Sequence, residues 1–145
     1  MLLLTVVTGL VDAVSYLALG HVFVANMTGN VVFLCFALAG ADELSAAASA
    51  VALVTFLAGA RAGGTLGARF PGHRGRLLRA AATVQTVLVA GSVAVAAGAD
   101  GRVSTDVRYA LIVLLSLAMG VQNAVARRLA VPDLTTTVLT LTLTG

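Results

Sequence analysis

The stretch that decides the fold is GLVDAVSYLALGHVFVANMTGN, residues 9–30. It places an ionisable residue, Asp12, and several small amides and hydroxyls inside segments that are otherwise apolar. Unpaired polar groups cost free energy in such surroundings, and ionisable residues at membrane depth usually serve a function. This stretch is therefore where we first look for a site.

The composition is that of a membrane protein. Of the 145 residues, 59% are hydrophobic and only 10% are charged, and the mean hydropathy is +1.03. Soluble domains carry roughly a quarter charged residues. The apolar runs of roughly 20 residues are long enough to cross a hydrocarbon core. The alternation of a membrane strand is absent, so helices must satisfy the backbone. We predict an all-α, polytopic transmembrane helix bundle.

The apolar runs predict one transmembrane domain over residues 1–145, with about six segments. We expect them at residues 2–19, 22–40, 46–60, 77–98, 107–126 and 131–145. Only Gly20 and His21 separate the first two, so a tight turn is expected there. The last run is too short to cross the bilayer at 1.5 Å per residue and is expected to be incomplete.

The basic residues predict a membrane topology. All nine are arginines, and those between residues 61 and 79 have no acid among them: Arg61, Arg69, Arg74, Arg76 and Arg79. By the positive-inside rule, the Arg61–Arg79 stretch is expected to be a cytoplasmic loop of a multi-pass protein of the bacterial inner (plasma) membrane. Arg127 and Arg128 are expected on the same side, and the amino terminus outside. This charge distribution does not indicate nucleic-acid binding.

A short internal repeat accompanies this pattern. Gly9-Leu-Val-Asp12-Ala13-Val14 recurs as Gly120-Val-Gln-Asn123-Ala124-Val125. Asp and Asn are both rare at membrane depth, which strengthens the match. With six crossings the two copies run in the same direction, as a parallel repeat. That inference requires residues 22–40 to cross the membrane fully.

Several motifs carry a family resemblance. They are residues 8–16, residues 23–30, the glycine-rich exit of the third segment, residues 120–124, and Thr136-Thr137-Val-Leu-Thr140. At these motifs the chain resembles the YoaK-like bacterial integral membrane proteins, a domain of unknown function (DUF1275). The resemblance covers nearly the whole chain and implies a helical membrane protein, but it implies no activity. Members usually continue past the threonine-rich segment with further hydrophobic segments, whereas this sequence ends at Gly145.

Asp12 is the central candidate site residue. It is expected near the bilayer centre, where a carboxylate costs several kcal/mol unless it is paired or protonated. One hypothesis makes it a proton or cation site. The other makes it a tie between helices, bonded to Asn123 or Arg61.

The amides and threonines also have two interpretations. Asn26, Thr28 and Asn30, with Gly29, either interrupt the second helix to line a solute site or bond neighbouring helices together within a continuous helix. Thr137 and Thr140 share one helical face and either line a polar path or bond back to their own helix.

Glycines at four-residue spacing indicate close helix packing. Gly59, Gly63 and Gly67 form a ridge on which another helix can pack, within the subunit or in a homo-oligomer.

We find no motif for catalysis, metal binding or phosphate binding in this sequence. We therefore expect no enzyme, no cofactor and no metal. The leading hypothesis is a permease- or channel-like protein for a small neutral or cationic solute, with proton coupling as an option. Its expected substrate-binding residues are Asp12, Asn26, Thr28, Asn30, Gln122, Asn123, Thr137 and Thr140, with Gln85 as a further contributor. The alternative is a non-transporting scaffold or assembly partner in the bilayer, whose polar residues specify helix packing.

Overall fold

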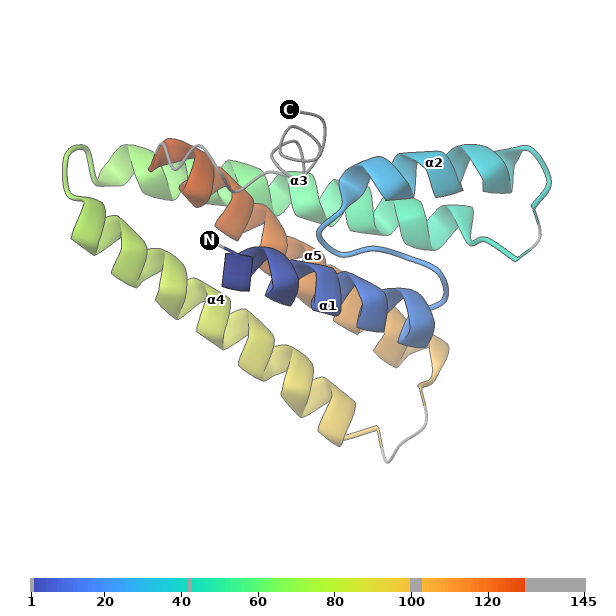
Figure 1. Cartoon of the computed structure of the whole chain (residues 1–145). Helices are drawn as coiled ribbons and strands as arrows, with labels where there is room; N and C mark the ends of the chain where they lie inside the picture. The colour runs from blue at the N-terminus through green and yellow to red at the C-terminus, as the bar shows by residue number, and fades with distance from the viewer. Residues whose placement is uncertain (1, 42, 100–102, 130–145) are drawn as a thin grey trace.

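Five helices make up the described part of the computed structural model, which covers residues 2–41, 43–99 and 103–129. They are α1 (Leu2–Ala18), α2 (Met27–Leu38), α3 (Ala46–Arg69), α4 (Arg74–Ala97) and α5 (Thr105–Arg128) (Figure 1). Within these ranges no residue is in a strand, so the all-helical expectation is confirmed. Helices α3, α4 and α5 are each 24 residues long and apolar enough to cross a membrane. At 1.5 Å per residue each spans about 36 Å.

The arginine-rich stretch is mostly helix, which corrects the expected loop between residues 61 and 79. Helix α3 continues past residue 60 to Arg69, and α4 begins at Arg74 instead of residue 77. Arginine is a good helix former, so the charges mark the ends of two helices. Only residues 70–73 connect them. Pro71 disfavours helix at the residue before it, and Gly72 completes the turn at φ +77°.

Helices α3 and α5 form the tightest contact of the fold, and they run in the same direction. Gly59 lies against the Leu117 backbone, and Gly63 lies against Val121 further along both helices. From α5, Gly120 lies against the Phe56 carbonyl. No side chain fits at these points, so the two backbones approach closely. Helix α4, which follows α3 in the chain, runs in the opposite direction, and its Leu77 and Ala81 pack against the end of α5.

The second expected segment does not form a crossing helix. Residues 22–40 were expected to span the membrane, but α2 begins only at Met27 and is 12 residues long, which gives about 18 Å. That is shorter than the roughly 30 Å hydrocarbon core. The expectation of about six segments is therefore not confirmed.

Residues 20–26 instead run back along α1. The Val22 carbonyl meets Ser15, and the amides of Val24 to Asn26 meet Asp12, one turn earlier in α1. Helix α2 then follows the direction of α1, which brings Phe33 to 5.8 Å from Tyr16. Thus α2 begins halfway along α1 and ends toward the end of the bundle where α1 ends (Figure 1). We call residues 20–38 the re-entrant element.

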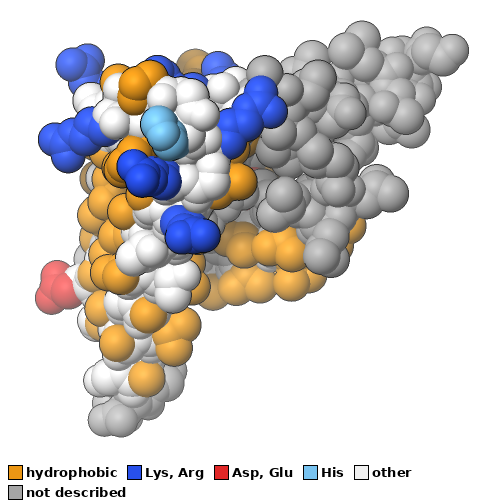
Figure 2. Space-filling view, turned by 90° about the vertical axis from the view of Figure 1, so that its left-hand side faces the viewer, with side chains coloured by type: hydrophobic (Ala, Val, Ile, Leu, Met, Phe, Trp, Pro, Cys, Tyr) orange, Lys and Arg blue, Asp and Glu red, His pale blue; other side chains and the backbone are white. Residues whose placement is uncertain are grey.

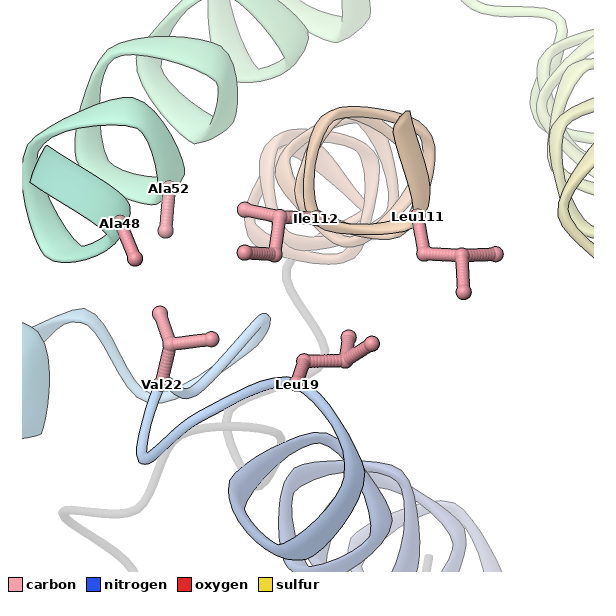
Figure 3. Close-up of a cluster of buried hydrophobic side chains, with 6 residues drawn as sticks. All are labelled: Leu19, Val22, Ala48, Ala52, Leu111 and Ile112. Carbon is pink, nitrogen blue, oxygen red and sulfur yellow. The ribbon is translucent and has the colours of Figure 1, made fainter. Parts of the chain in front are cut away.

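A buried apolar cluster joins the re-entrant element to the long helices. Figure 3 shows Leu19 and Val22 facing the first turns of α3 and α5. The cluster consists of Leu19, Val22, Ala48, Ala52, Leu111 and Ile112. It fixes the end of α1 beside the starts of α3 and α5.

The path of residues 20–26 also sets the relative direction of the two repeat copies, residues 9–14 and 120–125. Gly20, after the end of α1, lies against the side chain of Arg108 in the first turn of α5, so α1 and α5 run in opposite directions. The two copies therefore run in opposite directions, as an inverted repeat and not as the predicted parallel one, because residues 20–26 turn back along α1 before α2 begins. For the same reason α1 begins toward the arginine-rich end (Figure 1), not opposite to it as expected.

The repeat supplies a matched pair of substitutions. We expect Gly120→Val to destabilise the bundle by about 1–3 kcal/mol, because a Cβ there would overlap the Phe56 carbonyl oxygen. Gly9→Val, at the equivalent position of α1, has no atom within 4 Å of its new Cβ and should change stability by no more than about 0.5 kcal/mol. Unfolding in detergent checks both variants. Equal losses would contradict the α3–α5 contact described above.

Candidate functional site

The Asp12 carboxylate holds the extended part of the re-entrant element. Its Oδ1 accepts hydrogen bonds from the backbone N–H of Val24 at 2.9 Å and of Ala25 at 2.8 Å. Its Oδ2 accepts from the N–H of Asn26 at 2.9 Å. Asp12 is only 8% exposed. Because residues 22–26 are not helical, their amides have no partner within a helix, and the carboxylate supplies one.

Two further polar side chains complete this arrangement. Ser15, one turn after Asp12, places its Oγ 2.9 Å from the Asp12 carbonyl and 3.0 Å from the Val22 carbonyl, so its single hydrogen is shared between two acceptors. From α2, Asn30 donates to the Phe23 carbonyl and accepts from the Phe23 N–H. Ser15 and Asn30 are fully buried. We call Asp12, Ser15 and Asn30 the polar clamp.

The turn after α1 depends on a conformation that glycine adopts easily. Gly20 and His21 have φ of +82° and +59°, the left-handed region that most side chains disfavour. A Cβ at Gly20 would also meet the guanidinium of Arg108. Because Gly20 has no side chain, Arg108 of α5 can pack directly against the turn.

An aromatic cluster covers the re-entrant element. Tyr16 contacts His21 at 4.8 Å and Phe23 at 5.5 Å between ring centroids, and Phe23 stacks on Phe33 at 5.2 Å. Gly29 admits this stack, because a Cβ there would overlap the Phe23 ring. Gly29 thus serves packing inside a helix and does not break it.

The structure brings some of the predicted site residues together. Asp12, Asn26 and Asn30 meet at the start of α2, whereas Thr28 is exposed on α2. The Asp12 oxygens bond backbone amides, not Asn123 or Arg61. Thr137 and Thr140 lie outside the described residues.

The α5 candidates make a separate group. Gln122 accepts a hydrogen bond from Gln85 of α4, and Asn123 accepts one from Arg127 at 3.0 Å. Neither bonds a clamp residue. The predicted single site over both repeat copies is therefore two polar groups in this structure.

The sequence reasoning missed Ser15, Phe23 and Arg108. Ser15 lies three residues after Asp12, on the same helical face, and that spacing was a usable signal. Phe23 acts through Tyr16 and Asn30, each seven residues away, and it lies outside the helices, so no helical spacing marks it. Arg108 contacts Gly20, which is distant in sequence. The Arg108 Nε is buried without a hydrogen-bond partner.

The described residues bring together no three His, Cys, Asp or Glu side chains that could hold a metal.

Two cavities lie away from the clamp. One, of about 190 Å³, lies between α3, α4 and α5 beside Thr65 and Arg69. The other, of about 170 Å³, lies at the α3–α4 turn.

The polar clamp can exist in two states. An ionised carboxylate only accepts hydrogen bonds, and here it accepts three. Protonation turns one of its oxygens into a donor facing backbone N–H groups, which cannot accept. A proton on Asp12 would therefore loosen residues 24–26.

Membrane-length helices with a buried re-entrant element define a polytopic helical membrane protein. Residues 1–145 match the family model described as "Protein of unknown function (DUF1275)", and the chain belongs to that family, which confirms the resemblance. It is 34% identical over 141 residues to "UPF0700 transmembrane protein YoaK" of Bacillus subtilis (strain 168). The matched region covers 97% of this chain and 61% of YoaK. The chain thus spans about three fifths of that curated relative. No solved structure matches this chain.

The clamp makes a prediction about backbone amides. In Asp12→Ala we expect the amides of Val24, Ala25 and Asn26 to exchange with solvent at least about tenfold faster, because each loses a buried acceptor worth about 1–3 kcal/mol. Hydrogen exchange by mass spectrometry, with peptides covering residues 22–27, measures this. Asp106→Ala, at an exposed position on α5, is the control and should leave these amides protected. Unchanged protection in Asp12→Ala would contradict the clamp.

Proposed function

We propose that this protein is a permease- or channel-like membrane protein that moves a small neutral or cationic solute, with its site beside the start of α2. The observation that supports this is the re-entrant element. Non-helical backbone at membrane depth is tolerated only where protein buries it or where it lines a water-filled cavity. Transporters build solute sites from such interrupted helices, often between inverted repeats.

Charge favours a neutral or cationic solute. Among the described residues, Asp12 is the one acidic side chain in helices α1, α2 and α3 themselves. Arg61, the cation expected nearest to it, is exposed on α3 and makes no bond to the clamp. An anion would meet a negative charge without a compensating cation.

Asp12 acts in this proposal as a latch on the site. While ionised, it holds residues 24–26 against α1. When protonated, it releases at least one amide and lets the start of α2 move. Such a two-state element is what proton-coupled transport requires.

The proposed orientation follows from the arginines. Arg69, Arg74 and Arg128 lie at one end of the bundle, with α1 beginning toward that end (Figure 1). The positive-inside rule assigns this end to the cytoplasmic side of a bacterial plasma membrane.

A scaffold without transport activity is the second candidate. It is favoured by the clamp itself, since both carboxylate oxygens of Asp12 and both side-chain polar atoms of Asn30 bond within the protein. In that case Asp12 and Asn30 specify helix packing, and their loss lowers folding or oligomer yield.

Reconstitution tests the proposal. We expect the protein on a solid-supported membrane to give a current that depends on pH or solute, and we expect Asp12→Asn to reduce it at least about tenfold while remaining folded. Asp106→Asn is the matched control and should retain the current.

Two results would contradict transport through this site. One is a current that is equal in the parent and in Asp12→Asn. The other is absence of both current and radiolabelled-solute exchange in the parent, together with failure of Asp12→Asn to assemble. The second result would establish the scaffold.

A further inference from the structure

A cavity at the arginine-rich end has two arginines on its wall. It measures about 170 Å³ and lies where the α3–α4 turn meets the end of α5. Arg74 and Arg128 line it from α4 and α5, beside His73. The His73 Nδ1 donates to the Pro71 carbonyl at 3.0 Å, which holds the ring at the turn. The first residue of α4 and the last residue of α5 are thus both arginines that line the same cavity.

The backbone fixes where Arg128 lies. A Cβ at Gly67 would overlap the Arg128 side chain, so the arginine rests on α3 where that helix has no side chain. On the other wall, Gly72 at φ +77° makes the turn that starts α4 at Arg74. Both arginines are exposed, and both line this cavity.

Among the residues that the structure describes, no acidic side chain compensates the positive charge at this end. Figure 2, which looks onto the end where α3 meets α4, shows basic side chains gathered in its upper part. They belong to the ends of α3, α4 and α5: Arg69, Arg74, Arg76, Arg79, Arg127 and Arg128. The acidic residues of the described ranges lie elsewhere, in α1, between α2 and α3, and in the first turn of α5. An anion is therefore the favoured occupant.

The floor of the cavity is apolar. Phe70, Leu77 and Leu129 line it, and all three belong to a hydrophobic cluster that continues into the bundle with Val121 and Val125. A free inorganic anion gains nothing from such a floor. A lipid brings a phosphate together with apolar glycerol and acyl carbons, which match it.

We propose that this cavity is a binding site for the headgroup of an anionic glycerophospholipid. Arg74 and Arg128 bind the phosphate oxygens with charge-assisted hydrogen bonds. Leu77 and Leu129 contact the glycerol end, and the acyl chains run along α4 and α5. The cavity lies at the ends of membrane-length helices, the depth at which lipid phosphates lie. The site is separate from the polar clamp, and it is independent of whether the protein transports a solute.

Lipid binding to the full chain tests the proposal. The probe is phosphatidylglycerol added to the detergent-solubilised protein, with binding followed by native mass spectrometry. Phosphatidylcholine and inorganic phosphate are the comparison ligands. We expect phosphatidylglycerol to bind at least about tenfold more tightly than either, and Arg74→Gln/Arg128→Gln to lose at least about tenfold in affinity.

A matched variant separates this site from general surface charge. Arg76→Gln/Arg79→Gln removes the same charge from exposed positions of α4 that do not line the cavity, and it should change affinity by less than about threefold. Both double variants alter exposed side chains and should melt without lipid as the parent does. Equal losses in the two variants would overturn the site. Equal binding of phosphate and phosphatidylglycerol would overturn the lipid as its occupant.

Discussion

The fold depends on one carboxylate that binds three consecutive backbone amides. Residues 24–26 carry N–H groups that no helix satisfies, and in a membrane such groups cost several kcal/mol each. Asp12 supplies the acceptors at 2.8 to 2.9 Å. With those bonds the chain can turn back beside α1 and begin α2 halfway along it. Without them, the three amides would lose their acceptors.

The turn of the chain back along α1 affects the arrangement of the other helices. Because the chain turns back along α1 before α2 begins, α1 and α5 run in opposite directions, and the two Gly-x-x-Asp/Asn copies become an inverted repeat. The copies also differ in their neighbours. In α5, Gly120 packs against Phe56 of α3, and Ala124 approaches Gly63. In α1, Gly9 has no neighbour within 4 Å. The same motif thus makes a close helix crossing in one copy and is open in the other.

The sequence predicted the helical membrane class, the approximate positions of α4 and α5, and the start of α3. It could not predict the path of residues 20–26. Hydropathy is the same whether an apolar run is helical or extended. The partner of the extended residues 24–26 is Asp12, which lies 12 to 14 residues earlier in the sequence and meets them only after folding. Without that partner, residues 22–40 have the length and composition of a crossing helix.

The arginine-rich stretch, residues 61–79, was predicted to be a loop but is mostly helix, for a related reason. Five arginines without an acid look like a loop, yet arginine is a good helix former. The glycines beside them are tolerated in α3 because they contact α5, a tertiary effect with no local signal. Gly29 is similar, since its role is to admit the Phe23 ring and only the folded arrangement reveals it. Asp12 and Asn30 could be named from the sequence as polar and unusual, but Ser15 was not, and the partners of all three could not be predicted.

Whether residues 22–40 cross the membrane is the most direct test of this account. In a Cys35→Ala background, single cysteines replace His21, Glu43 and His73, all exposed between helices, and an impermeant thiol reagent is applied from each side of oriented membranes. The re-entrant element predicts that positions 21 and 43 react from the same side and position 73 from the other. Reaction of positions 21 and 43 from opposite sides would show a full crossing and would contradict the account.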